Sequence, residues 1–217
     1  MQNTIRELKK SFRLAMNGDV STSMRKSGID YKLNFGVSLP TIKKIAAKFN
    51  PNPELADYLF KENVRESKIV ATLIWPANEF PREKAEEWVS LIDKLEIAEQ
   101  ATMNLFVELP YAKDLMFEWN NSNDVHTRMT AHLLLVRLLI KDHDLSVSEL
   151  DSLLPSLIRD LRNENTTLFS LSLNAVKRLG RKDLSTRLHI LEKINNENNK
   201  LSGSVIEEIK TEYSYYA

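Results

Sequence analysis

Residues 55–73 read LADYLFKENVRESKIVATL, and residues 88–106, at an offset of 33, read WVSLIDKLEIAEQATMNLF. When the two stretches are aligned, apolar side chains coincide in six pairs: Leu55 with Trp88, Tyr58 with Leu91, Leu59 with Ile92, Val64 with Ile97, Val70 with Met103 and Leu73 with Phe106. A pattern that recurs at about 30 to 45 residues is typical of solenoids, in which stacked helix pairs share one core. The repeat therefore predicts paired helices.

Glycine and proline mark where these helices end. The chain holds only 5 Gly and 7 Pro, and no stretch has the β-branched alternation of a strand. Gly28 and Gly36 bracket an irregular connector, after which Ser38 is expected to cap a helix that has Pro40 in its first turn. Residues 124–141 are apolar nearly all round and should form a central helix. About a dozen helices are expected.

These patterns predict an all-α fold. We expect a single domain over residues 1–217, a curved α-α superhelix (solenoid) of HEAT-like helix pairs. A helical bundle without repeats is the alternative.

Composition excludes several classes of protein. The 217 residues include no Cys, which excludes a disulfide framework and a cysteine nucleophile and fits a reducing cytoplasm. The longest apolar stretch, residues 133–140, is interrupted by Arg137 and is too short to span a bilayer. We therefore expect a cytoplasmic protein with no membrane partner.

Charge is balanced in total but uneven along the chain. The 30 basic and 30 acidic residues cancel, whereas residues 1–50 hold ten Lys or Arg against three Asp or Glu. A neutral protein can bind a polyanion if its basic residues share a face. Ordinary solvated helix faces are the alternative interpretation.

Catalytic signatures are mostly absent. The sequence contains no Walker loop, G-x-G-x-x-G, H-E-x-x-H or G-x-S-x-G motif, and its four His lack metal-ligand spacing, so we expect neither a metal nor a cofactor. Two clusters remain, the carboxylates Glu96 and Glu99 and a basic group formed by Lys177, Arg178, Arg181, Lys182 and Arg187. Cations at the end of a helix can hold phosphates, but they also complement the helix dipole.

Four strings combine polar and apolar residues in an order that helical periodicity alone does not require. They are YKLNFGVSLPTIKKIA at 31–46, VRESKIVATL at 64–73, WVSLIDKLEIAEQATMNLF at 88–106 and AVKRLGRKD at 175–183. Over roughly residues 25–190, the sequence resembles the AlkD-like DNA alkylation repair family of HEAT-repeat DNA glycosylases.

The resemblance implies a chemistry and a set of positions. Active members hydrolyse the N-glycosidic bond of cationic N3- or N7-alkylpurines, and a fixed carboxylate stabilises the positive charge that builds on the sugar. Their Trp-Asp-x-x-Asp-Gln string matches residues 95–100, which places Glu99 at the catalytic Asp and Leu95 at the first Trp. The second Trp matches Asn174, and Arg128 matches an arginine that contacts the DNA backbone. An ion pair between Arg128 and Asp124 is the structural alternative.

From the sequence we therefore expect a DNA-binding DNA alkylation repair protein with an altered glycosylase site. Its partner should be duplex, damaged or branched DNA, held by Arg128, Lys177, Arg178, Arg181 and Lys182, and the protein should be a monomer. A non-catalytic binder of branched or distorted DNA is one alternative, and a HEAT-repeat scaffold for protein interactions is another.

Overall fold

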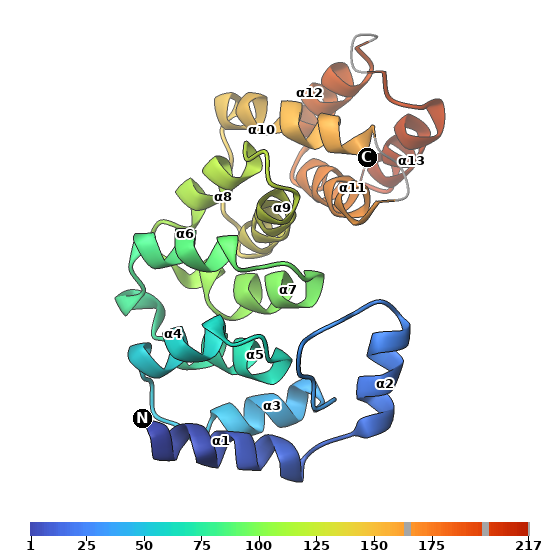
Figure 1. Cartoon of the computed structure of the whole chain (residues 1–217). Coiled ribbons are helices and arrows are strands. Elements are labelled where there is room, and N and C mark those ends of the chain that lie inside the picture. The colour runs from blue at the N-terminus through green and yellow to red at the C-terminus, as the bar shows by residue number, and fades with distance from the viewer. Residues whose placement is uncertain (163–165, 197–199, 217) are drawn as a thin grey trace. The chain divides into compact units, whose positions relative to one another are not determined.

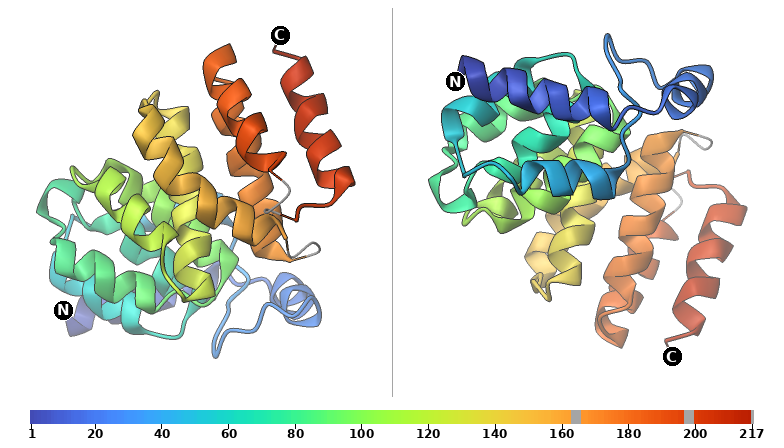
Figure 2. Two further views of the ribbon diagram at one scale, coloured as in Figure 1. Left: turned by 90° about the horizontal axis from the view of Figure 1, so that it is seen from above. Right: turned by 90° about the horizontal axis from the view of Figure 1, so that it is seen from below.

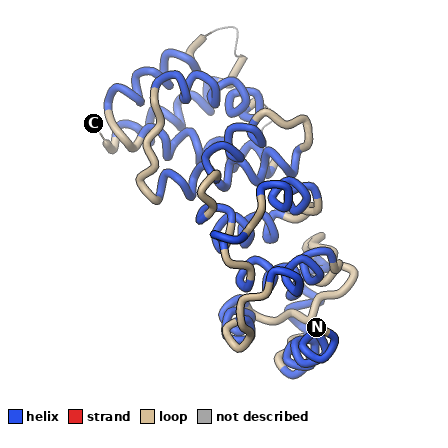
Figure 3. The backbone as a smooth tube through the Cα atoms, turned by 90° about the vertical axis from the view of Figure 1, so that its left-hand side faces the viewer, coloured by secondary structure: helices blue, strands red, loops and turns tan. Residues whose placement is uncertain are grey.

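A computed structural model of the chain describes residues 1–162, 166–196 and 200–216, which form helices and loops (Figure 3). The chain divides into two compact units, residues 1–110 and residues 111–217, here called unit 1 and unit 2. The helices of unit 1 are α1 (Gln2–Leu14), α2 (Gly18–Lys26), α3 (Leu39–Ala46), α4 (Pro53–Lys61), α5 (Arg65–Ile74), α6 (Arg82–Ser90) and α7 (Leu95–Asn104), with 3-10 turns η1 (Ala77–Glu79) and η2 (Phe106–Glu108). Those of unit 2 are α8 (Ala112–Asn120), α9 (Val125–Ile140), α10 (Val147–Leu161), α11 (Thr167–Gly180), α12 (Leu184–Ile194) and α13 (Gly203–Ser214).

The repeat seen in the sequence corresponds to two stacked helix pairs of unit 1. Figure 1 shows α4 beside α5, with α6 and α7 layered on them, and α5 packs directly against α7. Four of the six aligned pairs also agree in burial, and the pairs Val70 with Met103 and Leu73 with Phe106 differ. Leu55 and Trp88 are both buried and so are Leu59 and Ile92, whereas Tyr58 and Leu91 are exposed. The offset of 33 thus relates positions with the same role in the two pairs.

An aromatic cluster fills the core of unit 1 between these pairs. The rings of Phe60 and Trp88 stack with centroids 3.9 Å apart, and Trp75 and Phe80 contact Trp88 edge-on. Because aromatic rings bury large apolar areas, this cluster anchors the α4–α5 pair to the α6–α7 pair.

Polar side chains also connect the two pairs, at offsets of 31 and 32 residues. Trp88 Nε1 donates to Asp57 Oδ1 over 3.2 Å, and Asn104 Nδ2 donates to Thr72 Oγ1 over 2.9 Å. Each hydrogen bond joins a helix of one pair to the corresponding helix of the next pair. Hydrogen bonds as well as apolar burial therefore hold the two pairs together.

In unit 2, which Figure 2 draws from two directions, α11 is the helix that contacts the most neighbours. Helix α9 packs against α8 and α11, and α11 also contacts α10, α12 and α13. Helix α9 begins after Asp124, whose carboxylate accepts a hydrogen bond from the Thr127 backbone N–H over 2.7 Å. The predicted central helix is therefore present, although its end residues Val125 and Ile140 are about half exposed.

Docking of α13 depends on the one glycine inside α11. A Cβ on Gly180 would collide with the ring of Tyr213, so the absence of a side chain lets the two helices approach closely. Tyr213 is buried, and its hydroxyl donates to the Val176 carbonyl over 2.8 Å. This contact fixes α13 on the basic helix α11.

Candidate functional site

The catalytic position expected from the sequence lies in a hollow of unit 1 at the start of α7. The hollow measures about 340 Å³ and is lined by Met24, Gly28, Ile29, Lys94, Leu95, Glu96 and Glu99. Leu95 and Glu99 are four residues apart and therefore lie on the same face of the helix. Three aliphatic or thioether side chains and the half-buried Glu99 thus share one small depression. A carboxylate beside apolar walls can stabilise a cation that water does not fully screen.

The neighbouring Glu96 has a different role. Arg65 donates to both of its oxygens, from Nε to Oε2 over 2.8 Å and from Nη2 to Oε1 over 2.6 Å, and the Tyr31 hydroxyl donates to Oε2 over 3.1 Å. Burial, together with the adjacent Glu96, raises the pKa of Tyr31 well above its ordinary value, so this hydroxyl stays a donor. Both oxygens of Glu96 are therefore engaged in the structure of unit 1.

A buried ionic cluster supports this wall of the hollow. The carboxylate of Glu66, which is fully buried, accepts backbone N–H groups of Phe35 and Val37 over 3.1 and 3.2 Å. Arg65 Nη1 donates to the Val37 carbonyl and to Glu66. The irregular connector expected between Gly28 and Gly36 is thereby tied to α5 and, through Arg65, to α7.

The sequence did not reveal this cluster. Arg65 and Glu66 occupy the first turn of α5, where charged residues are ordinarily solvated. The string in which they occur was part of the family resemblance, but nothing in its spacing pointed to Glu96.

Arg128 and Asn174 both belong to unit 2. Arg128 is buried, with Nε donating to Asp160 over 3.1 Å and Nη1 donating to the carbonyls of Ser122 and Asn123. The alternative pairing with Asp124 is wrong, because Arg128 pairs with Asp160, while the Asp124 carboxylate caps α9. Asn174 is exposed on α11, one turn before Arg178.

The basic cluster forms at the C-terminal end of α11, but most of its members have acidic partners. Lys177 Nζ lies 2.6 Å from Glu208, Arg181 Nη2 lies 2.7 Å from Glu212, and Lys182 Nζ lies 2.7 Å from Asp144. Within the described residues, no carboxylate pairs with Arg178.

Arg187 departs from this group. It is buried, and its Nη1 donates to the Gly180 carbonyl over 3.2 Å. This contact caps the end of α11, so Arg187 is structural.

A buried histidine lies near Arg128. His132 on α9 is 1% exposed, and its Nε2 is 3.5 Å from Asp160, the carboxylate that Arg128 also contacts. Burial, followed by the charges of Arg128 and Arg159, lowers the pKa of His132 to about 3. The ring is therefore neutral at pH 7.

Among the described residues, no three His, Cys, Asp or Glu side chains gather as a metal ion would require. Likewise, no helix within the described part of the chain has the length and apolar character needed to cross a bilayer.

The helices and sites place the protein in an all-α class built from HEAT-like helix pairs. The model of the DNA alkylation repair enzyme family matches residues 8–203, and the chain belongs to that family. The resemblance and the fold class expected from the sequence are thereby confirmed.

A solved structure supports the fold. It is described as a new family of proteins related to the HEAT-like repeat DNA glycosylases with affinity for branched DNA structures. The two chains are 16% identical, and the match covers 97% of this chain and 94% of the other with a TM-score of 0.76. No curated protein matches the chain.

Proposed function

We propose that this protein binds DNA as a DNA alkylation repair protein with an altered glycosylase site. The observation that carries the proposal is the hollow at α7, which brings Glu99 together with Leu95, Met24 and Ile29 in a chain of the DNA alkylation repair family. By the resemblance, active members have a tryptophan at the position of Leu95. A leucine offers a cationic base no π face. Contact with the face of an aromatic ring would stabilise such a base by about 0.5 to 2 kcal/mol. Shape and charge, without stacking, would then hold the base.

Contact with the DNA backbone is assigned to the cations of unit 2. The C-terminal end of α11 and the turn after it carry four cations, Lys177, Arg178, Arg181 and Lys182. If these cations neutralise about 4 phosphates, the slope of log K against log salt should be near −3.6. Fluorescence anisotropy with a labelled duplex and a four-way junction, titrated with salt, measures this slope. If neither DNA binds at low salt, the protein-interaction scaffold becomes the better interpretation.

Arg128 is proposed to contact a phosphate through Nη2, since its other donors are directed at protein oxygens. Arg128→Ala should then weaken binding equally for all sequences and flatten the salt slope by about 1. The same change should also destabilise unit 2, because the buried Asp160 loses the hydrogen bond from Arg128 and keeps the longer 3.5 Å contact with Arg159. If stability falls while affinity is unchanged at a temperature where the variant is folded, Arg128 is purely structural.

A second candidate function is slow excision of cationic alkylpurines, supported by the position of Glu99 in the hollow. Such bases are already activated leaving groups, so a negative charge alone can assist their departure. Glu99→Gln removes that charge at nearly constant shape and should abolish release of 7-methylguanine from methylated duplex DNA. Glu83→Gln on α6, an exposed position outside the hollow, is the matched control. Release that survives Glu99→Gln would remove Glu99 from the catalytic role.

Substitutions toward the family pattern test the same idea in the other direction. Glu99→Asp combined with Leu95→Trp should raise the excision rate, because both side chains would then match those of active members. If the wild type releases no base above spontaneous depurination, the non-catalytic binder of branched DNA is the function that remains. We expect the protein to act as a monomer. We also expect it in the cytoplasm, which its cysteine-free sequence fits.

A further inference from the structure

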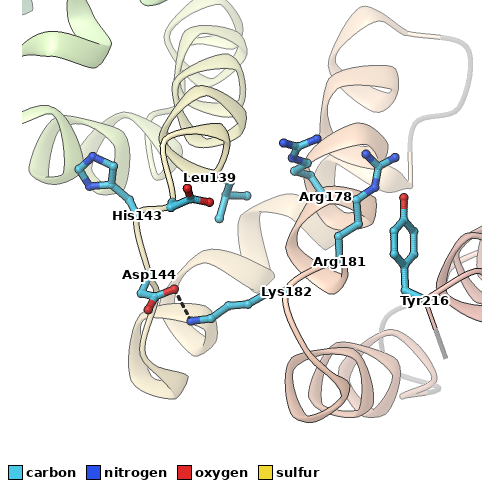
Figure 4. Close-up of a pocket in the computed structure, with 8 residues that line it drawn as sticks. Leu139, His143, Asp144, Arg178, Arg181, Lys182 and Tyr216 are labelled. Atoms are coloured by element: carbon cyan, nitrogen blue, oxygen red, sulfur yellow. Dashed lines mark ion pairs between the residues drawn. The ribbon is translucent and has the colours of Figure 1, made fainter.

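A second hollow lies wholly within unit 2, at the C-terminal ends of α9 and α11 (Figure 4). It measures about 530 Å³, within the range of roughly 300 to 1,000 Å³ that is usual for small-ligand pockets. It is lined by Leu139, Asp142, His143, Asp144, Arg178, Arg181, Lys182 and Tyr216. Cations, carboxylates, an aromatic ring and an aliphatic side chain thus surround one cavity.

The cations of this hollow differ in how they are neutralised. Lys182 pairs with Asp144, drawn as a dashed line in Figure 4, and Arg181 directs Nε and Nη2 at a single oxygen of Glu212. Arg178 has no carboxylate partner within the described residues. The guanidinium of Arg178 and the remaining donors of Arg181 can therefore receive an anion without breaking an existing ion pair.

The hollow is also lined by the carboxylate of Asp142, a residue whose backbone conformation is unusual. Asp142 follows α9 with φ of 58°, in the left-handed region that favours glycine at the end of a helix. The turn is closed by the His143 backbone N–H, which donates to the Leu138 carbonyl over 3.1 Å. A glycine would satisfy this turn at lower cost, so the carboxylate of Asp142 is a candidate for a function.

An aromatic side chain completes the lining. Tyr216 is 42% exposed, and the Arg181 guanidinium lies 5.5 Å from the centroid of its ring. The ring and Leu139 offer apolar contact beside the cations.

We propose that this hollow binds a single nucleotide that carries a terminal phosphate monoester. The phosphate lies between Arg178 and Arg181, sugar or base N–H and O–H groups donate to Asp142, and the base contacts Tyr216. A monoester carries a charge of about −1.5 to −2 at pH 7 and three acceptor oxygens, which suit the Arg178 guanidinium and the remaining N–H donors of Arg181. Contact along a duplex would use these cations for internal phosphates, whereas the hollow also offers a ring and a carboxylate to the base and sugar of a terminal nucleotide. The site therefore goes beyond the proposed function, because binding along a duplex requires no terminal nucleotide.

Two sources supply this chemistry, a free deoxynucleoside 5′-monophosphate and the 5′-phosphorylated end of a DNA strand. Calorimetry of the full chain with dAMP tests the first. Anisotropy with duplexes that differ only in a 5′-phosphate or a 5′-hydroxyl tests the second. We expect binding of dAMP, tighter binding of the phosphorylated duplex, or both, and the affected affinity should fall about tenfold or more in Arg178→Gln.

Two further variants make the test specific. Lys210→Gln removes an equal charge from α13, where Lys210 pairs with Glu207, and should leave dAMP binding unchanged. Asp142→Asn keeps a residue that tolerates positive φ. This variant should weaken the binding of dAMP. It should not weaken the binding of inorganic phosphate, which has no sugar or base group that could donate a hydrogen bond to the carboxylate.

Several results would overturn the inference. It fails if dAMP does not bind and the two duplexes bind equally, even when both bind well and DNA binding itself is established. It also fails if Arg178→Gln and Lys210→Gln weaken dAMP equally, because the effect would then be one of net charge. Equal binding of inorganic phosphate and dAMP would show that no nucleotide is recognised.

Discussion

Replacing Glu208 and Glu212 of α13 by glutamine is expected to strengthen DNA binding. These carboxylates pair with Lys177 and Arg181, two of the cations assigned to the DNA backbone, and DNA must displace them. The paired side chains are 19% to 50% exposed, and pairs of this kind are worth about 0.2 to 1 kcal/mol each. Removing both should therefore raise the affinity roughly 2- to 30-fold.

The salt dependence gives a second and more specific measurement. Lys177 and Arg181 already count among the cations behind the slope of about −3.6, so the affinity should rise while the slope of log K against log salt stays near −3.6. Helix α13 should remain docked, because Tyr213 is anchored to α11 independently of the two carboxylates. Anisotropy with one duplex at four or five salt concentrations measures affinity and slope together, and circular dichroism checks that the helices are retained.

The control must change the net charge equally without freeing a cation of α11. Glu192→Gln with Glu207→Gln meets this need, because Glu192 is exposed on α12 and Glu207 pairs with Lys210 on its own helix. If the control pair raises affinity as much as Glu208→Gln with Glu212→Gln, the effect is general electrostatics and the competition is refuted. Unchanged affinity in both pairs would show that Lys177 and Arg181 do not contact DNA.

Three predictions concern stability. The pKa of His132 is lowered to about 3 in the folded state, whereas in the unfolded state it is about 6.5. The unfolded state therefore binds the extra proton, and the free energy of unfolding falls as the pH drops from about 6.5 toward 3. At pH 4.5 the loss should be about 2 to 3 kcal/mol. Urea unfolding should show that His132→Leu removes this part of the pH dependence, and an unaltered profile would contradict it. Gly180→Ala should lower the free energy of unfolding by about 1 to 3 kcal/mol, because the added methyl group clashes with Tyr213. Most of that loss should disappear when Tyr213 is also replaced by Ala. Additive losses in the double variant would argue against the contact. Asp142→Gly should stabilise the protein by about 0.5 to 1 kcal/mol, measured as a rise in Tm, because φ of 58° suits glycine; a fall in Tm would mean that the carboxylate supports the fold.

Much of the fold could be predicted because it depends on local signals. Apolar residues at helical spacing correctly predicted which helix faces are buried. The offset of 33 correctly aligned two buried residues, Leu55 and Trp88, and two exposed ones, Tyr58 and Leu91. Ser38 was correctly placed before α3, although its hydroxyl bonds to Thr41 Oγ1 and makes no cap bond to the backbone. The start of α3 could be predicted because a polar residue followed by Pro in the first turn is a local signal, whichever partner the Ser38 hydroxyl then finds.

The site could be predicted only in part, because charged side chains choose partners that are distant in sequence. Leu95 and Glu99 share a hollow as their spacing on one helix requires. Local spacing suggested Asp124 as the partner of Arg128, but the ion pair forms with Asp160, 32 residues away. The acidic partners of the basic cluster were missed for the same reason, since Glu208 and Glu212 lie 31 residues beyond the cations that they neutralise. The catalytic role of Glu99 and the DNA contacts stay predictions.

The bidentate contact between Arg65 and Glu96 has a consequence for how unit 1 unfolds. Stacked repeats melt one at a time when each pair is stable alone, and together when the coupling between neighbours dominates. Separating the α4–α5 pair from α7 would take Glu96 away from the Arg65 guanidinium, which is 5% exposed and would keep Glu66 as its ionic partner. The loss of a carboxylate partner by a buried guanidinium costs on the order of a few kcal/mol. The most protected backbone amides of α5 and α7 should therefore report the same free energy of opening in hydrogen–deuterium exchange, as parts of a single cooperative unit.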